Sequence, residues 1–143
     1  MKIKDVIQHK GDQGVVTIGP EATVRELVAL LAEHNVGALV VSEDGERVAG
    51  IVSERDVVRR LHEDAAVLDG VVSSIMTADV RTCGTDDGLT DLMQTMTEHR
   101  IRHVPVVADG RLTGIISIGD VVKSRIGELE FERDQLDHYV HQT

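Results

Sequence analysis

The stretch GIVSERDVV at residues 50–58 returns 64 residues later as GIISIGDVV at residues 114–122. A second block, HNVGALVV at 34–41, returns 65 residues later as HRIRHVPV at 99–106. An internal repeat of this kind is the strongest indication of the architecture, because each copy is one supersecondary unit. Two copies predict a body with a pseudo-twofold axis, in which a ligand site at the seam between the copies occurs as a pair.

The first copy has the pattern of a strand, a helix, two strands and a second helix. Residues 14–18 form a short apolar strand, and the TVRE sequence at 23–26 has the Thr-x-x-Glu form of a capping box that starts a helix. The run at 38–41 is apolar throughout, so we expect a strand that is buried on both faces. A turn then leads to a return strand over 48–52 and to a helix over 53–62.

The second copy repeats this order, and residues 63–78 link the two. We expect its first strand at 79–82, its first helix along an apolar stripe that begins at Leu89, and its hairpin strands at 104–107 and 112–116. The last helix follows directly. The sequence therefore predicts an α/β fold with parallel strands, made of two β-α-β-β-α motifs related by a pseudo-twofold axis, plus an extended C-terminal helix.

The last helix continues far beyond its counterpart in the first copy. Its inward positions alternate spacings of four and three with one polar break, at Val122, Ile126, Leu129, Arg133, Leu136 and Val140. Such a heptad-like stripe needs a partner surface, either its own domain or a second subunit, and we expect a homodimer. The predicted organisation is an N-terminal segment at 1–9, a first motif at 10–72, a second motif at 73–126 and a C-terminal amphipathic helix at 127–143.

Composition narrows the function classes. The 143 residues carry a formal net charge of −10 and no run of Lys or Arg, which argues against a nucleic-acid partner. No apolar run approaches the roughly 18 residues that a membrane span needs, and no signal peptide is evident. The single cysteine, Cys83, excludes an intramolecular disulfide, and no metal-ligand spacing is present. We expect a cytoplasmic protein with no membrane association.

A Ser-x-x-Asp pair stands at the start of the last helix of each copy, as Ser53 with Asp56 and Ser117 with Asp120. One interpretation is structural, because serine is a good N-cap and an acidic residue in the first turn favours the positive end of the helix. The other is functional, because both pairs follow the carboxyl end of a strand, where α/β sheets bind ligands. Both copies keep both residues although their neighbours differ.

The same residues have the chemistry of a nucleotide site. A carboxylate such as Asp120 can accept two hydrogen bonds at once from the vicinal diol of a ribose, and a helix N-terminus suits a phosphate. Small or aliphatic side chains can form a slot for a flat base, and Arg102 and His103 can supply positive charge. These slot residues are Val16, Val36, Gly37 and Ala38. Neither G-x-x-x-x-G-K-[ST] nor G-x-G-x-x-G occurs in the chain.

The repeated endings and the His-x-[VI]-x-x-[LV] centres resemble cystathionine-β-synthase (CBS) domains. The tandem pair is similar to a Bateman module, here as a stand-alone protein of the bacterial type. The resemblance covers roughly residues 10 to 126, and SSIMT-x-x-V at 73–80 matches the usual entry to a second copy.

The resemblance implies two clefts between the copies that bind an adenosine compound as a regulatory ligand rather than a cofactor. The ligand would be AMP, ADP, ATP, S-adenosylmethionine or NAD. Carried over by position, the preferred cleft contains Val16, Val36, Gly37, Ala38, Arg102, His103, Ser117 and Asp120. The second cleft contains Ser53, Arg55, Asp56, Met76, Val80, Arg81, Ile101 and Arg102. The first ranks higher because Arg102 and His103 are paired there for phosphate.

Three classes of function remain open at this point. The first is an adenosine-nucleotide sensor that regulates a separate, unidentified protein target. The second is a non-catalytic interaction subunit with vestigial clefts, whose acidic helix docks another protein. The third is an enzyme, which we do not expect, because both Ser/Asp pairs have capping positions and the chain offers no evident nucleophile and base.

Overall fold

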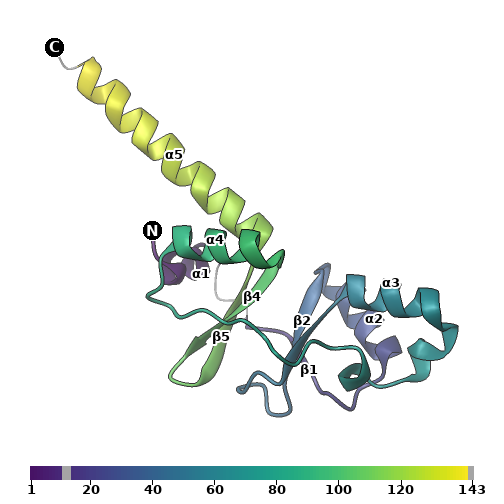
Figure 1. Ribbon diagram of the computed structural model, residues 1–143. Coiled ribbons are helices and arrows are strands. Elements are labelled where there is room, and N and C mark those ends of the chain that lie inside the picture. Colours follow the sequence, from purple (N-terminus) through teal and green to yellow (C-terminus); the bar gives the residue numbers. More distant parts are fainter. Residues whose placement is uncertain (11–13, 142–143) are drawn as a thin grey trace.

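The computed structural model describes residues 1–10 and 14–141, which form two α/β halves lying side by side (Figure 1). One half is built from the first repeat and the other mainly from the second. A long helix, α5 (Ile118–Val140), leaves the second half and extends away from the body. The prediction of an α/β protein made of two similar motifs and an extended C-terminal helix is confirmed.

The first half contains a three-stranded sheet and two helices: β1 (Thr17–Ile18), α2 (Val24–His34), β2 (Ala38–Val41), β3 (Gly50–Ser53) and α3 (Glu54–Glu63). The central strand β2 is buried at every position, as its continuous apolar run predicts. Two short 3-10 turns, η1 (Ala65–Asp69) and η2 (Val72–Ser74), then lead to the second half.

The second half contains α4 (Leu89–His99), β4 (His103–Ala108) and β5 (Arg111–Ser117). β4 and β5 are antiparallel, with Val104 opposite Ile116, and β2 and β3 are antiparallel in the same way, with Leu39 opposite Val52. The prediction of parallel strands is therefore wrong for both hairpins, since a short turn can join only antiparallel neighbours. Among the described strands, only β1 and β2 pair in parallel.

The expected strand at 79–82 is also absent. The chain instead makes one parallel bridge to β4 at Cys83, whose N–H donates to the Pro105 carbonyl at 3.0 Å while its own carbonyl accepts from Val107 N–H at 2.9 Å. Asp79, Arg81 and Thr82 are exposed, and Val80 alone in this stretch is partly buried. Burial raises the pKa of the Cys83 thiol to about 12, which keeps it protonated at neutral pH.

The N-terminal segment forms a helix, α1 (Ile3–Lys10), that the sequence analysis did not predict. Although α1 precedes the first repeat, it packs in the core of the second half, where Ile3 is 0% exposed and Val6 is 1% exposed. Met1 joins it to the start of α4, because the Met1 carbonyl accepts from Leu89 N–H at 3.0 Å. The chain therefore begins in the second half, next to α4 and the base of α5 (Figure 1).

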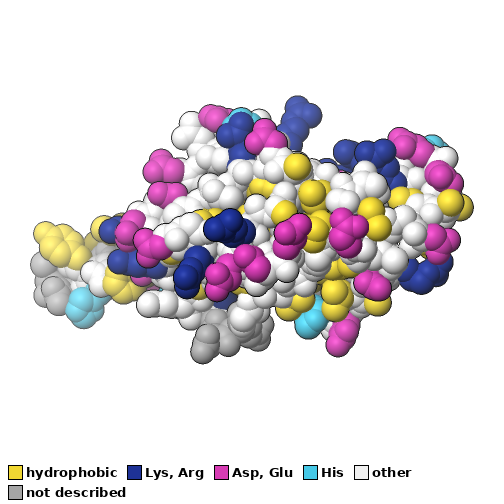
Figure 2. Space-filling model, turned by 90° about the horizontal axis from the view of Figure 1, so that it is seen from below, with side chains coloured by type: hydrophobic (Ala, Val, Ile, Leu, Met, Phe, Trp, Pro, Cys, Tyr) yellow, Lys and Arg dark blue, Asp and Glu magenta, His cyan; other side chains and the backbone are white. Residues whose placement is uncertain are grey.

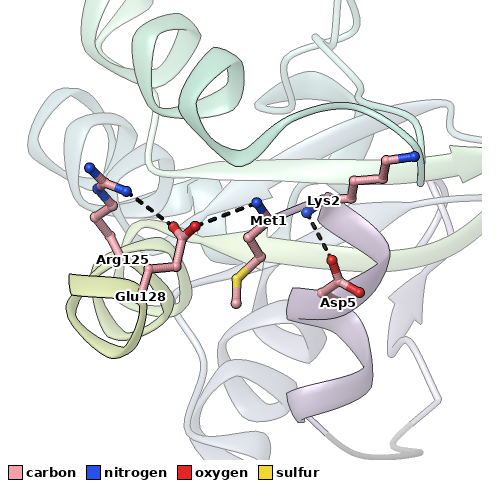
Figure 3. Close-up of polar contacts among 5 residues, drawn as sticks. All are labelled: Met1, Lys2, Asp5, Arg125 and Glu128. Atoms are coloured by element: carbon pink, nitrogen blue, oxygen red, sulfur yellow. Dashed lines mark hydrogen bonds and ion pairs between the residues drawn. The ribbon is translucent and has the colours of Figure 1, made fainter. Parts of the chain in front are cut away.

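The start of α1 is tied to α5 by a small polar network (Figure 3). The N-terminal ammonium of Met1 lies 3.4 Å from Glu128 Oε2, and Arg125 donates to the other oxygen of the same carboxylate at 3.4 Å. Just before α1, the N–H of Lys2 donates to Asp5 Oδ2 at 2.9 Å, which ties the first turn of the helix to the residue that precedes it. These contacts hold the first half of α5 against the body.

The apolar stripe of α5 is exposed to solvent. Val122, Ile126 and Leu129 are each about half exposed, and Leu136 is 65% exposed. Figure 2 shows hydrophobic side chains exposed at the left end of the molecule, the side to which α5 extends in Figure 1. Its own domain therefore leaves most of the predicted stripe uncovered. Within the described residues, no helix has both the length and the apolar character that crossing a bilayer requires.

Candidate functional site

Both Ser-x-x-Asp pairs form complete capping boxes. In the first copy, Ser53 N–H donates to Asp56 Oδ2 at 2.8 Å and Asp56 N–H donates to Ser53 Oγ at 3.3 Å. In the second copy, Ser117 N–H donates to Asp120 Oδ2 at 2.9 Å and Asp120 N–H donates to Ser117 Oγ at 3.2 Å. The structural role is thus present in both copies, and each carboxylate uses Oδ2 for it.

Asp120 has an additional partner from a distant part of the chain. Lys10 Nζ, at the end of α1, lies 2.8 Å from Asp120 Oδ2 and donates to the Ile115 carbonyl at 2.7 Å. Burial raises the pKa of Asp120, but the hydrogen bonds from Lys10 and Ser117 outweigh it and hold the pKa below its ordinary value. Sequence reasoning missed Lys10, because no motif marks a lone lysine in a segment that appeared to precede the fold.

Gly37 and His103 come together at the seam between the halves. A Cβ on Gly37 would lie 3.5 Å from His103 Cε1 and 3.6 Å from Glu54 Oε1, so glycine leaves ordinary contact distance for both side chains. Gly37 ends the turn before β2 and His103 begins β4, which makes them neighbours across the seam. Two residues that the resemblance assigns to the preferred cleft therefore lie close together in the structure.

His103 is half-buried among charged groups of both signs. Burial lowers its pKa below the ordinary value, although Asp120 and Glu54 act in the opposite direction. The imidazole is therefore neutral at neutral pH and can donate one hydrogen bond, but it does not supply the positive charge that the sequence analysis assigned to it. The positive charges of Lys10 and Arg102 also act to lower the pKa of His103.

The predicted base slot borders a cavity of about 170 Å³ between the halves. Val16, Val36 and Ala38 line it from the first half, and Gly114 and Ile115 line it from β5. Lys10 also lines this cavity, which we call the Lys10 cleft. Gly37, Arg102, His103, Ser117 and Asp120, the other predicted residues of the preferred cleft, are outside its lining.

A second cavity, of about 350 Å³, is lined by more of the predicted polar residues than the Lys10 cleft is. Five residues predicted for the second cleft line it: Ser53, Arg55, Asp56, Ile101 and Arg102. The structure adds two arginines that sequence reasoning missed, Arg59 on α3 and Arg100 after α4. We call this cavity the arginine cleft. His103 and Ala38, predicted for the other cleft, also line it.

Three residues predicted for the second cleft lie outside the lining of the arginine cleft: Met76, Val80 and Arg81. Met76 packs partly buried on the core of the first half, where its Sδ would lie 2.7 Å from a Cβ on Gly50. Its neighbour Thr77 lines the cleft instead, held by reciprocal backbone hydrogen bonds of 2.9 Å with Ile51. At this point of the cleft the linker therefore contributes Thr77, where the resemblance implies Met76.

A further cavity, of about 680 Å³, lies between α1 and α5. Val6, Gly127 and Phe131 provide apolar lining, while Lys10 and Asp120 stand in its wall. Asp120 thus opens toward the α1–α5 side, and Lys10 borders both this cavity and the Lys10 cleft. In residues 1–10 and 14–141, no group of three or more His, Cys, Asp or Glu side chains is placed to hold a metal ion.

The comparisons with known proteins agree with this architecture. The CBS domain family model matches residues 3–63 and 72–127. The mitochondrial CBS domain-containing protein CBSX3 of Arabidopsis thaliana is 36% identical over 146 residues, covering 96% of this chain and 71% of that protein. The crystal structure of the CBS-domain protein ATU1752 from Agrobacterium tumefaciens is 46% identical with a TM-score of 0.82, covering 87% of this chain and 99% of that one.

A third similar structure contains ligands. It is the CBS domain pair of protein MJ0100 in complex with 5′-methylthioadenosine and S-adenosyl-L-methionine, 25% identical with a TM-score of 0.78, covering 90% of this chain and 98% of that one. The family match spans both repeats, and the whole two-copy body superposes on solved CBS pairs. The chain therefore belongs to the CBS domain family, as a tandem pair of CBS domains.

Proposed function

We propose that this protein is a regulatory module that binds an adenosine nucleotide in clefts between its two CBS domains. The observation that carries the proposal is the placement of Ser53 and Asp56. They lie at the carboxyl end of β3 and line a cavity that residues of both domains enclose. The family relationship and the adenosine ligands of the MJ0100 pair support it.

Each capping carboxylate keeps an oxygen for a ligand. The cap and the Lys10 contact use Oδ2, and no hydrogen bond joins Oδ1 of Asp56 or Asp120 to any described residue. A ribose diol at such a carboxylate would add hydrogen bonds without dismantling the cap. The two roles of the Ser-x-x-Asp pair are therefore compatible.

The proposed role is regulatory rather than catalytic. Both serine hydroxyls accept the N–H of the aspartate three residues later, and within the described residues neither has a histidine partner that could take its proton. We propose that the regulated target is a separate protein, and that the module works as a homodimer in the cytoplasm. The exposed stripe of α5 supports the dimer, because it offers an uncovered apolar surface.

The direct test is a thermal-shift panel of AMP, ADP, ATP, S-adenosylmethionine and NAD on the full chain. A ligand at 100 times its dissociation constant stabilises by about 2.7 kcal/mol, which for a chain of this size corresponds to a shift on the order of 5–10 °C. Mass spectrometry of small molecules that co-purify with the protein would identify the physiological ligand. If no compound moves the melting temperature, the protein is instead a non-catalytic interaction subunit with vestigial clefts.

A further inference from the structure

We infer that the arginine cleft takes a polyphosphate chain, so that its ligand is a di- or triphosphate rather than S-adenosylmethionine or a neutral adenosine compound. The inference rests on the proposed function and narrows it to a ligand class and one of the two clefts. Four arginines line this single cavity, and all four are exposed to solvent: Arg55, Arg59, Arg100 and Arg102. The whole chain has eleven arginines and a net charge of −10.

None of these four arginines has an ion pair or a side-chain hydrogen bond within the described part of the chain. Five other arginines do pair with carboxylates: Arg25, Arg60, Arg111, Arg125 and Arg133. The cleft contains only two carboxylates, Glu54 and Asp56, and Asp56 is engaged by its own cap. Four cations with two nearby anions leave the cavity with a net positive charge in an acidic protein.

The backbone conformation of Arg100 is a second observation that supports a ligand-binding role for the four arginines of this cleft. Arg100 closes α4 in the left-handed region, at φ 54° and ψ 43°. Asn35 closes α2 at the equivalent point of the first domain, at φ 51° and ψ 49°. Asparagine tolerates this region well, whereas a long unbranched side chain adopts it at a cost. The first domain has the favourable residue at this position, and the second has an arginine that lines the cleft.

The pseudo-twofold axis provides an internal comparison. The positions equivalent to Arg55, Arg59, Arg100 and Arg102 in the other domain are occupied by Gly119, Lys123, Asn35 and Gly37. The arginines are therefore a property of one cleft and not of the repeat. The order of the clefts expected from the sequence is the opposite one, because Arg102, which the resemblance places in both clefts, was paired with His103 at the cleft of Asp120.

Guanidinium groups bind phosphate oxygens through two parallel hydrogen bonds, so several arginines around one cavity match a ligand with several phosphates. S-adenosylmethionine carries a sulfonium and an ammonium group against a single carboxylate, so its net charge is positive and the same arginines disfavour it. 5′-Methylthioadenosine carries no charge for them to bind. We therefore expect affinity to increase with each phosphate added to adenosine.

Calorimetric titration of the full chain with ATP, AMP, inorganic triphosphate, 5′-methylthioadenosine and S-adenosylmethionine tests this. We expect ATP to bind at least about tenfold more tightly than AMP, roughly 1.4 kcal/mol. The variant Arg100→Asn carries the residue of the other domain, so it should fold with an unchanged or higher melting temperature and bind ATP about tenfold more weakly. Arg47→Asn is the matched control, since Arg47 is exposed, lies outside the cleft and should leave ATP binding unchanged.

The possible results separate this inference from the proposed function. If 5′-methylthioadenosine or S-adenosylmethionine binds as tightly as ATP, or if Arg100→Asn keeps the ATP affinity, the polyphosphate inference is wrong while the adenosine function stands. If inorganic triphosphate binds as tightly as ATP and Arg100→Asn weakens both, the polyphosphate site is supported and the adenosine function is not. If no compound binds, both fail.

Discussion

Lys10 and Asp120 are 110 residues apart in the sequence, yet Lys10 Nζ lies 2.8 Å from Asp120 Oδ2. The contact joins the last residue of α1 to the first turn of α5, at the point where the Lys10 cleft and the α1–α5 cavity meet. A ligand that binds Asp120 must therefore share the carboxylate with an ammonium group. In the other domain, Asp56 has no lysine or arginine within ion-pair distance among the described residues.

We predict that Asp56→Asn weakens adenosine-ligand binding in the arginine cleft by about tenfold, because a hydrogen bond to a charged group contributes about 1.5–3 kcal/mol. Asp120→Asn should weaken binding by a similar factor for a ligand that reaches Asp120 from the α1–α5 cavity, which Asp120 lines. Calorimetric titration of both variants measures this. The loss of the cap charge alone would cost only a few tenths of a kcal/mol in stability and leave affinity unchanged. Unchanged affinity with a small fall in melting temperature would mean that the pair is only a helix cap.

The Lys10–Asp120 contact predicts a pH dependence. The pKa of Asp120 is lowered in the folded state, so its contribution to stability is present above its unfolded pKa, near 4, and is lost as the pH falls through the folded value. Lys10→Met removes the partner, and because Lys10 is partly exposed the cost at neutral pH should be at most about 1 kcal/mol. Melting temperatures of wild type and variant should differ at pH 6 and converge below pH 4; a constant difference would contradict the assignment.

His103 predicts a second pH dependence of stability, at a higher pH than that of Asp120. Its pKa is lowered chiefly by burial, so the unfolded chain binds a proton at a higher pH than the folded one, and wild-type stability falls as the pH drops below about 6.5. His103→Gln should lessen this fall in thermal melts between pH 7.5 and 5.5. His138→Gln, on the distal part of α5, is the comparison for the loss of one histidine. NMR titration of the His103 ring should give a pKa below 6.5.

Two glycines predict contrasting effects of the same substitution. A Cβ on Gly50 would lie 2.7 Å from Met76 Sδ and 2.8 Å from the Thr77 carbonyl oxygen, and the backbone cannot move away easily. Gly50→Ala should therefore destabilise the protein by about 1–3 kcal/mol through overpacking. Gly37→Ala meets its neighbours at 3.5 Å and should change the free energy of unfolding little. Denaturant unfolding of the two variants would show the prediction wrong if their midpoints were equal.

The exposed stripe of α5 predicts self-association. Leu136→Glu places a charge in the stripe and should shift light scattering at micromolar protein from a dimer mass to a monomer mass. Gln135→Glu adds the same charge one residue away, outside the stripe, and should leave the dimer intact. Deleting residues 127–143 should weaken the dimer as well. A monomer mass for the wild type would rule out the homodimer.

Much of the candidate site could be predicted from the repeat. Copies of one motif must place equivalent residues in equivalent positions, so the sequence alone indicated that the Ser-x-x-Asp pairs begin two helices at strand ends and that two turns of the chain face them. Gly37 and His103 do meet at the seam. The 4-3 spacing likewise predicted the extended helix, because that spacing is a local property of the chain.

Contacts between segments far apart in the sequence were decided by the tertiary structure. Lys10 reaches Asp120 because Ile3 and Val6 bury α1 in the second domain, and a helix of eight residues with few apolar positions gives too weak a pattern to reveal its partner. Arg102, which the resemblance places in both clefts, lines the arginine cleft together with Asp56, while its carbonyl accepts from Ile118 N–H at the start of α5 at 2.8 Å. Sequence periodicity determines which face of an element is apolar, but the packing of distant elements determines which charged groups share a cavity.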